Sequence, residues 1–188
     1  EWDIGADDRY LAINPLAHRA GCARLFNALG LGGTLVVMER FDAEKALELI
    51  ERERITSAGG VPTIAWQLLE HPARDNYDLS SLESVSYGGA PGSAELVRRI
   101  RDGIPRAAPG LGWGMTETSP LASISRVSAL QAGLDEDAQF RIKATQGHTV
   151  PLVEVRAVGV VASSGKPLTA DNLLNSRTNA LSISCPTA

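Results

Sequence analysis

The sequence has few aromatic residues, few cysteines and no excess of basic charge. Aromatic residues make up 5% of the 188 residues while hydrophobic residues make up 44%, so a core must consist mostly of Leu, Val, Ile and Ala. The cysteines Cys22 and Cys185 form no metal-ligand spacing and no disulfide framework, which fits a reducing compartment, and we expect a cytoplasmic location. The formal net charge of −4 argues against a nucleic-acid-binding protein. No run of 18 apolar residues occurs, so no transmembrane segment is expected.

Several familiar catalytic signatures are also missing. No G-x-S-x-G motif occurs, so a hydrolase nucleophile elbow is not supported. No G-x-G-x-x-G motif follows a strand and opens a helix. The stretch "SSGKP" resembles a P-loop only briefly, because Gly159 and Gly165 are one residue too far apart and Pro167 replaces the required Ser or Thr.

Strands and helices are expected to alternate along the first 114 residues. Asp42 is a good N-cap, and an apolar face at helical spacing follows it, formed by Ala43, Ala46, Leu47 and Ile50. Ser93 is a candidate cap for a later helix. The expected strands lie at residues 34–38, 55–62, 83–90 and 107–114, with helices at 22–29, 41–55, 62–71 and 91–104. This alternation predicts an α/β fold with a mostly parallel sheet.

Three glycine-bearing loops follow the expected strands. They contain Gly59-Gly60, Gly88-Gly89-Ala90 and Gly112-Trp113-Gly114. In open α/β sheets, ligands bind at the carboxyl ends of the strands. The coincidence of the glycines with these ends predicts a binding site there.

The stretch "GWGMTETSP", residues 112–120, has the chemistry of a nucleotide site. Trp113 offers an aromatic face for a base, Thr116 a hydroxyl for a phosphate oxygen, and Glu117 a hard oxygen ligand for Mg²⁺. A glycine-rich turn with a solvated glutamate explains the same residues equally well. His18, in "NPLAHRAG", is either a loop or partly buried structural histidine or part of a site.

These segments together resemble the adenylate-forming (AMP-binding) superfamily. "GWGMTET" is similar to the family motif "GYGMTET", and "SYGGAPGSAELVRRI", "GGVPT" and "NPLAHRAG" resemble family segments in the same order. The resemblance covers about residues 7–125, is highly specific in combination, and fits the acyl-CoA synthetase (fatty-acid-CoA ligase) branch best. It implies that the chain is a fragment of the large N-terminal domain of such an enzyme.

The resemblance implies a two-step reaction with ATP and coenzyme A. A carboxylic acid attacks ATP to give an acyl-adenylate and pyrophosphate, and coenzyme A then displaces AMP. Carried over to this sequence, Trp113 stacks on adenine, Thr116 contacts the phosphate, Glu117 binds Mg²⁺ and His18 lines the acyl and thioester entrance. The remaining implied nucleotide-binding residues are Gly88, Gly89, Ala90, Gly112, Gly114 and Met115, and the implied acyl-pocket residues are Val61, Pro62 and Gly89.

The sequence also departs from the family. Ala17 replaces the usual aromatic residue beside His18, and the family's phosphate loop, ribose-binding aspartate and catalytic lysine have no match. We therefore expect a fragment that is inactive alone; the alternatives are a non-catalytic nucleotide-binding remnant and a non-functional truncated gene product. The expected organisation is a partial adenylation domain at 1–129, a weakly family-like segment with one strand at 130–158, and a divergent, poorly ordered tail at 159–188.

Overall fold

The structure, a computed structural model, describes residues 5–129, 131–151, 153–158 and 180–184. The chain divides into two compact units, residues 1–148 and 149–188. In the second unit, strand β8 (Glu154–Val158) pairs antiparallel with β9 (Ala180–Ser184). β8 is the strand predicted at 153–158. Most of the predicted tail, residues 159–179 and 185–188, lies outside the described residues.

Among the described residues, seven strands form one sheet in the order β2-β1-β3-β4-β5-β6-β7. Their bounds are Arg9–Ala12 (β1), Thr34–Val37 (β2), Ser57–Gly60 (β3), Ser84–Gly88 (β4), Ala108–Trp113 (β5), Ser123–Ser125 (β6) and His148–Thr149 (β7). Strands β1 to β5 pair in parallel, and β6 pairs antiparallel with β5. The predicted α/β class with a mostly parallel sheet is confirmed.

The five described α-helices span Arg19–Leu31 (α1), Ala43–Arg52 (α2), Pro62–Leu69 (α3), Ala94–Gly103 (α4) and Glu136–Lys143 (α5). Two of them, α2 and α4, begin directly after the capping residues that the sequence predicts. Asp42 Oδ1 accepts a hydrogen bond from Lys45 N at 2.8 Å, and Ser93 Oγ accepts one from Leu96 N at 3.1 Å. Both caps satisfy backbone N–H groups that would otherwise lack a helical partner.

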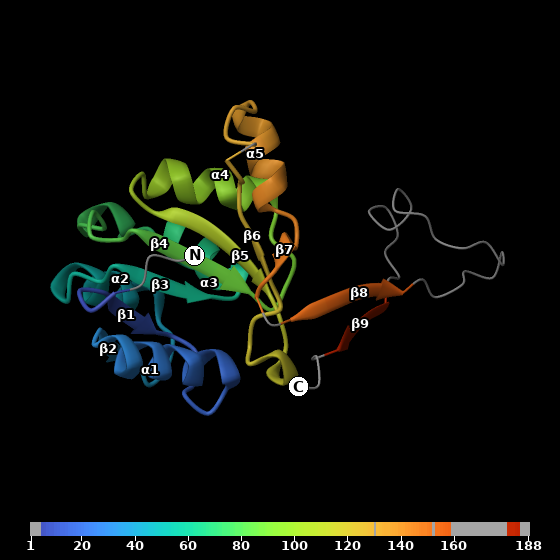
Figure 1. Cartoon of the computed structure of the whole chain (residues 1–188). Coiled ribbons are helices and arrows are strands. Elements are labelled where there is room, and N and C mark those ends of the chain that lie inside the picture. Colours follow the sequence, from blue (N-terminus) through green and yellow to red (C-terminus); the bar gives the residue numbers. More distant parts are fainter. Residues whose placement is uncertain (1–4, 130, 152, 159–179, 185–188) are drawn as a thin grey trace. The chain divides into compact units, whose positions relative to one another are not determined.

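The order of the strands reverses beside β1. The chain runs from β1 through α1 to β2 on one side, then through α2 to β3 on the other side of β1. Because parallel crossovers are right-handed, this reversal places α1 on one face of the sheet and α2, α3 and α4 on the other, as the ribbon allows the reader to follow (Figure 1). Such a reversal leaves a crevice at the carboxyl ends of the strands, between β1 and β3.

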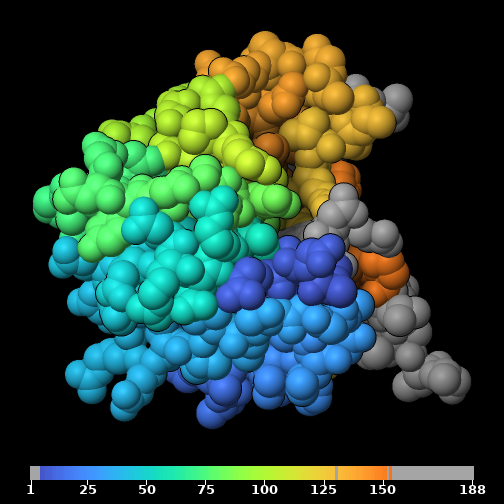
Figure 2. Space-filling view, turned by 90° about the vertical axis from the view of Figure 1, so that its left-hand side faces the viewer, coloured from blue at the N-terminus to red at the C-terminus, as the bar shows by residue number. Residues whose placement is uncertain are grey.

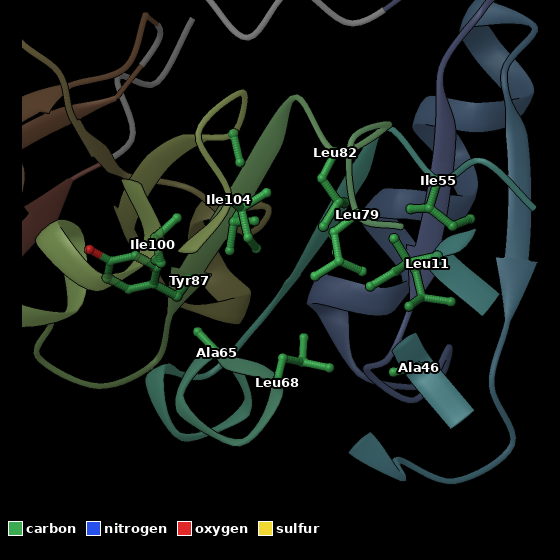
Figure 3. Packing of buried hydrophobic residues seen from close by; sticks show 14 of the residues in the cluster. Leu11, Ala46, Ile55, Ala65, Leu68, Leu79, Leu82, Tyr87, Ile100 and Ile104 are labelled. Carbon is green, nitrogen blue, oxygen red and sulfur yellow. The ribbon is translucent and has the colours of Figure 1, made fainter. Parts of the chain in front are cut away.

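The core fills the space between the sheet and the α2–α4 layer (Figure 3). Six residues of the predicted inner faces are fully buried: Ala46, Leu47 and Ile50 in α2, and Leu96, Val97 and Ile100 in α4. Ala43, also predicted on the inner face of α2, is only partly buried. Burying a Leu or Ile side chain stabilises a fold by roughly 1.5–3 kcal/mol. These two faces therefore fix both helices against the sheet.

Among the described strands and α-helices of the first unit, four were not predicted from the sequence: β1, β6, β7 and α5. Helix α5 packs beside α4, as the adjoining orange and yellow-green segments show (Figure 2). The guanidinium groups of Arg98 and Arg101 in α4 lie 5.4 and 4.9 Å from the centroid of the Phe140 ring in α5. Arg98 Nη2 also lies 2.7 Å from Asp137 Oδ1. Contacts between the two helices, rather than a local pattern, thus hold α5 in place.

Candidate functional site

A cavity of about 700 Å³ lies at the carboxyl ends of the central strands, where the strand order reverses. Its walls come from the segment after β1, from the ends of β3, β4 and β5 with the segments that follow them, and from the first three turns of α1. It is lined by Asn14, His18, Arg19, Ala20, Ala23, Arg24, Asn27, Gly59, Gly60, Val61, Ser86, Tyr87, Gly88, Gly89, Gly112, Gly114, Met115, Thr116, Glu117, Ser119, Pro120 and Leu121. All of these residues belong to the first unit.

The three glycine-bearing loops therefore converge on one cavity. Nine of the predicted site residues line it: His18, Val61, Gly88, Gly89, Gly112, Gly114, Met115, Thr116 and Glu117. Pro62, Ala90 and Trp113 are not among its lining residues. Pro62 is the first residue of α3 and Ala90 is an exposed residue after β4. Trp113 shares a face of β5 with buried Leu111 because alternate strand residues point the same way.

Two of these glycines are required by close approach of the backbone. A Cβ added at Gly59 would lie 2.5 Å from the carbonyl oxygen of Ser86 and closer still to Ser86 Oγ. A Cβ at Gly114 would overlap the carbonyl oxygen of Pro120. Any larger residue would therefore displace backbone that forms the cavity wall.

His18 forms the N-cap of α1 and also lines the cavity. Its Nδ1 accepts a hydrogen bond from Ala20 N at 3.3 Å, and its side chain is exposed. In a neutral imidazole one nitrogen accepts and the other donates, so this bond assigns the proton to Nε2. The structural and the site interpretations of His18 are thus compatible.

The turn that carries Thr116 and Glu117 is held by Thr118, whose role the sequence analysis missed. Thr118 Oγ1 accepts a hydrogen bond from Met115 N at 3.1 Å and lies within hydrogen-bond distance of the carbonyl oxygens of Met115 and Pro120. Arg19 Nη2 donates to the Ser119 carbonyl at 3.2 Å and so ties the start of α1 to this turn. The turn leaves the side chains of Thr116 and Glu117 exposed at the cavity.

Arg24 is a second residue that the sequence analysis missed. Its Nη1 donates to Ser57 Oγ at 3.2 Å and its Nη2 to Ser86 Oγ at 2.6 Å. Its guanidinium lies 5.6 Å from the centroid of the Tyr10 ring. Burial lowers the pKa of Arg24 from its ordinary value, and the nearby Tyr10 and Asp8 partly offset that effect. No motif surrounds Arg24, so only its place on α1 facing the cavity reveals it.

The donor set fits a magnesium ion that a phosphate ligand also coordinates. Within the described part of the chain, no three His, Cys, Asp or Glu side chains group into a metal site. Glu117 is the single acidic residue among those that line the cavity. Mg²⁺ commonly binds through one or two carboxylates together with substrate phosphates and waters. Glu117 supplies the carboxylate, and Thr116 lies beside it. The described residues contain no group of side chains that would bind the metal ion without a phosphate ligand.

Comparison with known proteins relates the chain to CoA ligases. The profile of a family described as AMP-binding enzyme matches residues 1–170. A 4-coumarate-CoA ligase of Narcissus pseudonarcissus is 38% identical over 119 residues, which are 63% of this chain and 22% of that protein. A 7a-methyl-1,5-dioxo-octahydro-1H-inden-4-yl propanoyl:CoA ligase of Mycobacterium tuberculosis is 40% identical over 124 residues, 65% of this chain and 24% of that protein. The chain thus spans about a quarter or less of the length of these relatives.

Solved structures show the same architecture. The inhibitor-bound N-terminal domain of FACL13 from Mycobacterium tuberculosis superposes with a TM-score of 0.70 at 26% identity, covering 88% of this chain and 38% of that one. The amide bond synthetase McbA from Marinactinospora thermotolerans gives a TM-score of 0.68 at 31% identity, covering 88% of this chain and 31% of that one. In the described residues, no helix is both long and apolar enough to cross a membrane.

Proposed function

The chain belongs to the AMP-binding enzyme family, and we propose that it forms the nucleotide- and acyl-binding part of an ATP-dependent acyl-CoA ligase. The parent reaction joins a carboxylic acid to ATP as an acyl-adenylate with release of pyrophosphate, and coenzyme A then displaces AMP to form the thioester. We also infer a cytoplasmic location, which the cysteine usage of the sequence supports.

One observation carries this proposal: the ends of β3, β4 and β5 and the start of α1 enclose a single cavity. These four places hold the four segments that resemble the family. The reversal of strand order beside β1 puts the cavity where α/β proteins bind ligands. A cavity of about 700 Å³ is also within the range of small-molecule sites.

The proposed roles follow from what each residue offers. Thr116 donates its hydroxyl to the α-phosphate, and Glu117 holds Mg²⁺ against the phosphates, whose negative charge the ion neutralises during transfer. Trp113, with Gly112, Gly114 and Met115, binds the adenine. Stacking of Trp113 on the adenine requires its side chain to turn toward the nucleotide, because Trp113 does not line the cavity in this structure.

The acyl side of the cavity is proposed to lie between α1 and β3. Val61 forms its wall, and Gly88 and Gly89 separate it from the adenine. Pro62 and Ala90, the other two residues implied by the resemblance, do not line the cavity and follow Val61 and Gly89 directly in the chain. His18, with its proton on Nε2, lies at the entrance through which coenzyme A reaches the acyl group. Its position as N-cap fixes the ring at that entrance.

Calorimetry on the 188-residue chain tests this proposal. We expect AMP to bind with a micromolar Kd and the affinity to fall roughly 5- to 150-fold in Trp113→Ala, because base stacking on an aromatic ring contributes about 1–3 kcal/mol. Glu117→Gln should weaken ATP binding in the presence of Mg²⁺ and leave AMP binding without metal unchanged. Glu44→Gln, an exposed glutamate on α2, is the matched control.

Two results bear on different parts of the proposal. A folded sample that binds neither AMP nor ATP overturns the nucleotide site. We expect no ATP–pyrophosphate exchange from this chain, because it spans only about a quarter of its relatives. ATP–pyrophosphate exchange above background would show that this chain completes adenylation unaided, and it would refute the expectation that the chain is inactive alone.

A further inference from the structure

Arg19 joins the start of α1 to the turn that carries Thr116 and Glu117. Its Nη2 donates a hydrogen bond to the carbonyl oxygen of Ser119 at 3.2 Å, although the two residues are 100 positions apart in the sequence. Ser119 N in turn donates to the carbonyl oxygen of Thr116 at 3.2 Å. These two hydrogen bonds connect the guanidinium to the residue whose hydroxyl is proposed to contact the α-phosphate.

The bond to Ser119 leaves Arg19 able to bind a ligand as well. A guanidinium has five N–H donors, and this bond uses one of them. Arg19 is only partly buried, and it lines the same cavity as Thr116, Glu117 and Ser119. The guanidinium therefore lies beside the turn at which the phosphate is proposed to bind.

The two arginines of the cavity wall reach different places. The charged residues that line the cavity are Arg19, Arg24 and Glu117. Arg24 donates hydrogen bonds to Ser57 on β3 and to Ser86 on β4. Arg19 instead reaches the turn after β5. Arg19 is thus the lining cation that the fold places next to Thr116 and Glu117.

A nucleotide phosphate requires more than this turn offers by itself. The hydroxyl of Thr116 donates one hydrogen bond and carries no charge. The carboxylate of Glu117 repels a phosphate unless a metal ion lies between them. A guanidinium supplies positive charge and a planar fork of N–H groups that matches two phosphate oxygens. An arginine beside Thr116 therefore balances the negative charge that the phosphate brings into the cavity.

We propose, on the basis of the function proposed above, that Arg19 binds the α-phosphate of the nucleotide together with Thr116. One N–H keeps the bond to Ser119, and others donate to the phosphate oxygens. In the reaction, a carboxylate oxygen forms a bond to the α-phosphorus, and pyrophosphate leaves with the electron pair of the broken P–O bond. Arg19 is a catalytic residue in this step, because its charge stabilises the negative charge on the phosphate oxygens during transfer.

Three nucleosides test this proposal by calorimetry on the 188-residue chain without Mg²⁺. They are AMP, adenosine and 5′-O-sulfamoyladenosine, whose sulfamoyl group takes the place of the phosphate without its charge. We expect AMP to bind about 10- to 100-fold tighter than either uncharged nucleoside, as hydrogen bonds between charged groups provide. The ratio of the AMP and adenosine affinities measures the contribution of the phosphate.

Variants assign that ratio to Arg19. Arg19→Met should lower AMP affinity about tenfold and leave adenosine affinity within about twofold. Arg19→Lys keeps the charge but not the fork and should retain part of the ratio, whereas Arg19→Gln, an uncharged donor, should bind AMP as weakly as Arg19→Met. Arg52→Met removes an exposed arginine from α2 and is the matched control. Far-UV circular dichroism checks that each variant is folded.

Salt separates binding by charge from positioning of the turn. AMP affinity of the parent chain should fall as NaCl is raised, because dissolved ions screen a partly exposed charge pair. Arg19→Met should show a weaker dependence on salt. Thr118→Val removes hydrogen bonds that hold the turn but keeps the charge of Arg19, so its AMP affinity should depend on salt as that of the parent chain does.

The outcomes separate this inference from the proposed function. If the parent chain binds AMP and Arg19→Met leaves the ratio of affinities unchanged, the inference is wrong and the nucleotide site stands; that result would also follow if Arg19 bound the carboxylate of the acid. If Arg19→Gln binds AMP as the parent chain does, Arg19 acts only through Ser119, and the inference is again wrong. If neither AMP nor adenosine binds, the proposed function falls and the inference falls with it.

Discussion

Substituting alanine for Gly59 or for Gly30 adds the same methyl group, in a crowded place at Gly59 and in an open place at Gly30. Gly59 lies in the cavity wall, where a Cβ would meet Ser86. Gly30 lies near the exposed end of α1, where a Cβ would meet no heavy atom within 4 Å. Neither glycine has a positive φ, so backbone strain does not enter the comparison.

The expected effects have opposite signs. Overpacking costs about 1–3 kcal/mol, and at Gly59 the obstacle is backbone of the paired strand β4, which has little freedom to move. At Gly30 alanine gains about 0.5–1 kcal/mol, because glycine loses more conformational entropy in a helix. The two substitutions should therefore differ by roughly 1.5–4 kcal/mol in the free energy of unfolding, by subtraction of these ranges.

Urea unfolding followed by tryptophan fluorescence and circular dichroism measures this difference. With an m-value of about 2 kcal/mol/M, Gly59→Ala should lower the midpoint by roughly 1 M and Gly30→Ala should raise it by up to about 0.5 M. A Gly59→Ala variant as stable as the parent chain would refute the close spacing of β3 and β4 on which the cavity wall depends.

Two further predictions concern residues around the cavity. Burial raises the pKa of Tyr87 to about 12. Below pH 10 Tyr87 is protonated in both the folded and the unfolded chain, whereas from pH 10 to 12 only the unfolded chain ionises, so the protein loses stability over that range. In urea titrations at these pH values, Tyr87→Phe should therefore lose less stability than the parent chain. Thr118→Val removes the hydrogen bonds that hold the Thr116–Thr118 turn, so Mg²⁺–ATP affinity should fall by about 1–2 kcal/mol while the urea midpoint changes little; an unchanged affinity would contradict the positioning role.

Strong local patterns made α2 and α4 predictable. Each has a capping side chain at its start and an apolar face at helical spacing. The pattern indicated all three buried residues of α4 and three of the four in α2, where Leu49 was missed and Ala43 is only partly buried. Helix α1 was predicted only in part, at 22–29 instead of Arg19–Leu31. Its apolar residues do not form one face, and Phe26 and Leu29 are 61% and 72% exposed.

The missed elements depend on distant partners. Strand β1 has four residues, and its pairing with β2 and β3 on either side makes it a strand. Strand β6 has three residues, and α5 buries only Phe140, under two arginines of α4. Periodicity within so few residues does not distinguish a strand or helix from a loop, so such elements follow from tertiary contacts alone.

The candidate site depends both on local sequence patterns and on tertiary contacts. Glycines at the ends of β3, β4 and β5 indicate where backbone must approach closely, and that signal is local, so the sequence located one edge of the cavity. The other edge consists of α1, which faces this cavity only because β1 lies between β2 and β3 and reverses the strand order. Arg24 lines the cavity as a consequence of that reversal. Its place in the cavity wall could therefore not be predicted without β1, whereas the chemistry of Thr116 and Glu117 could be proposed from their own motif.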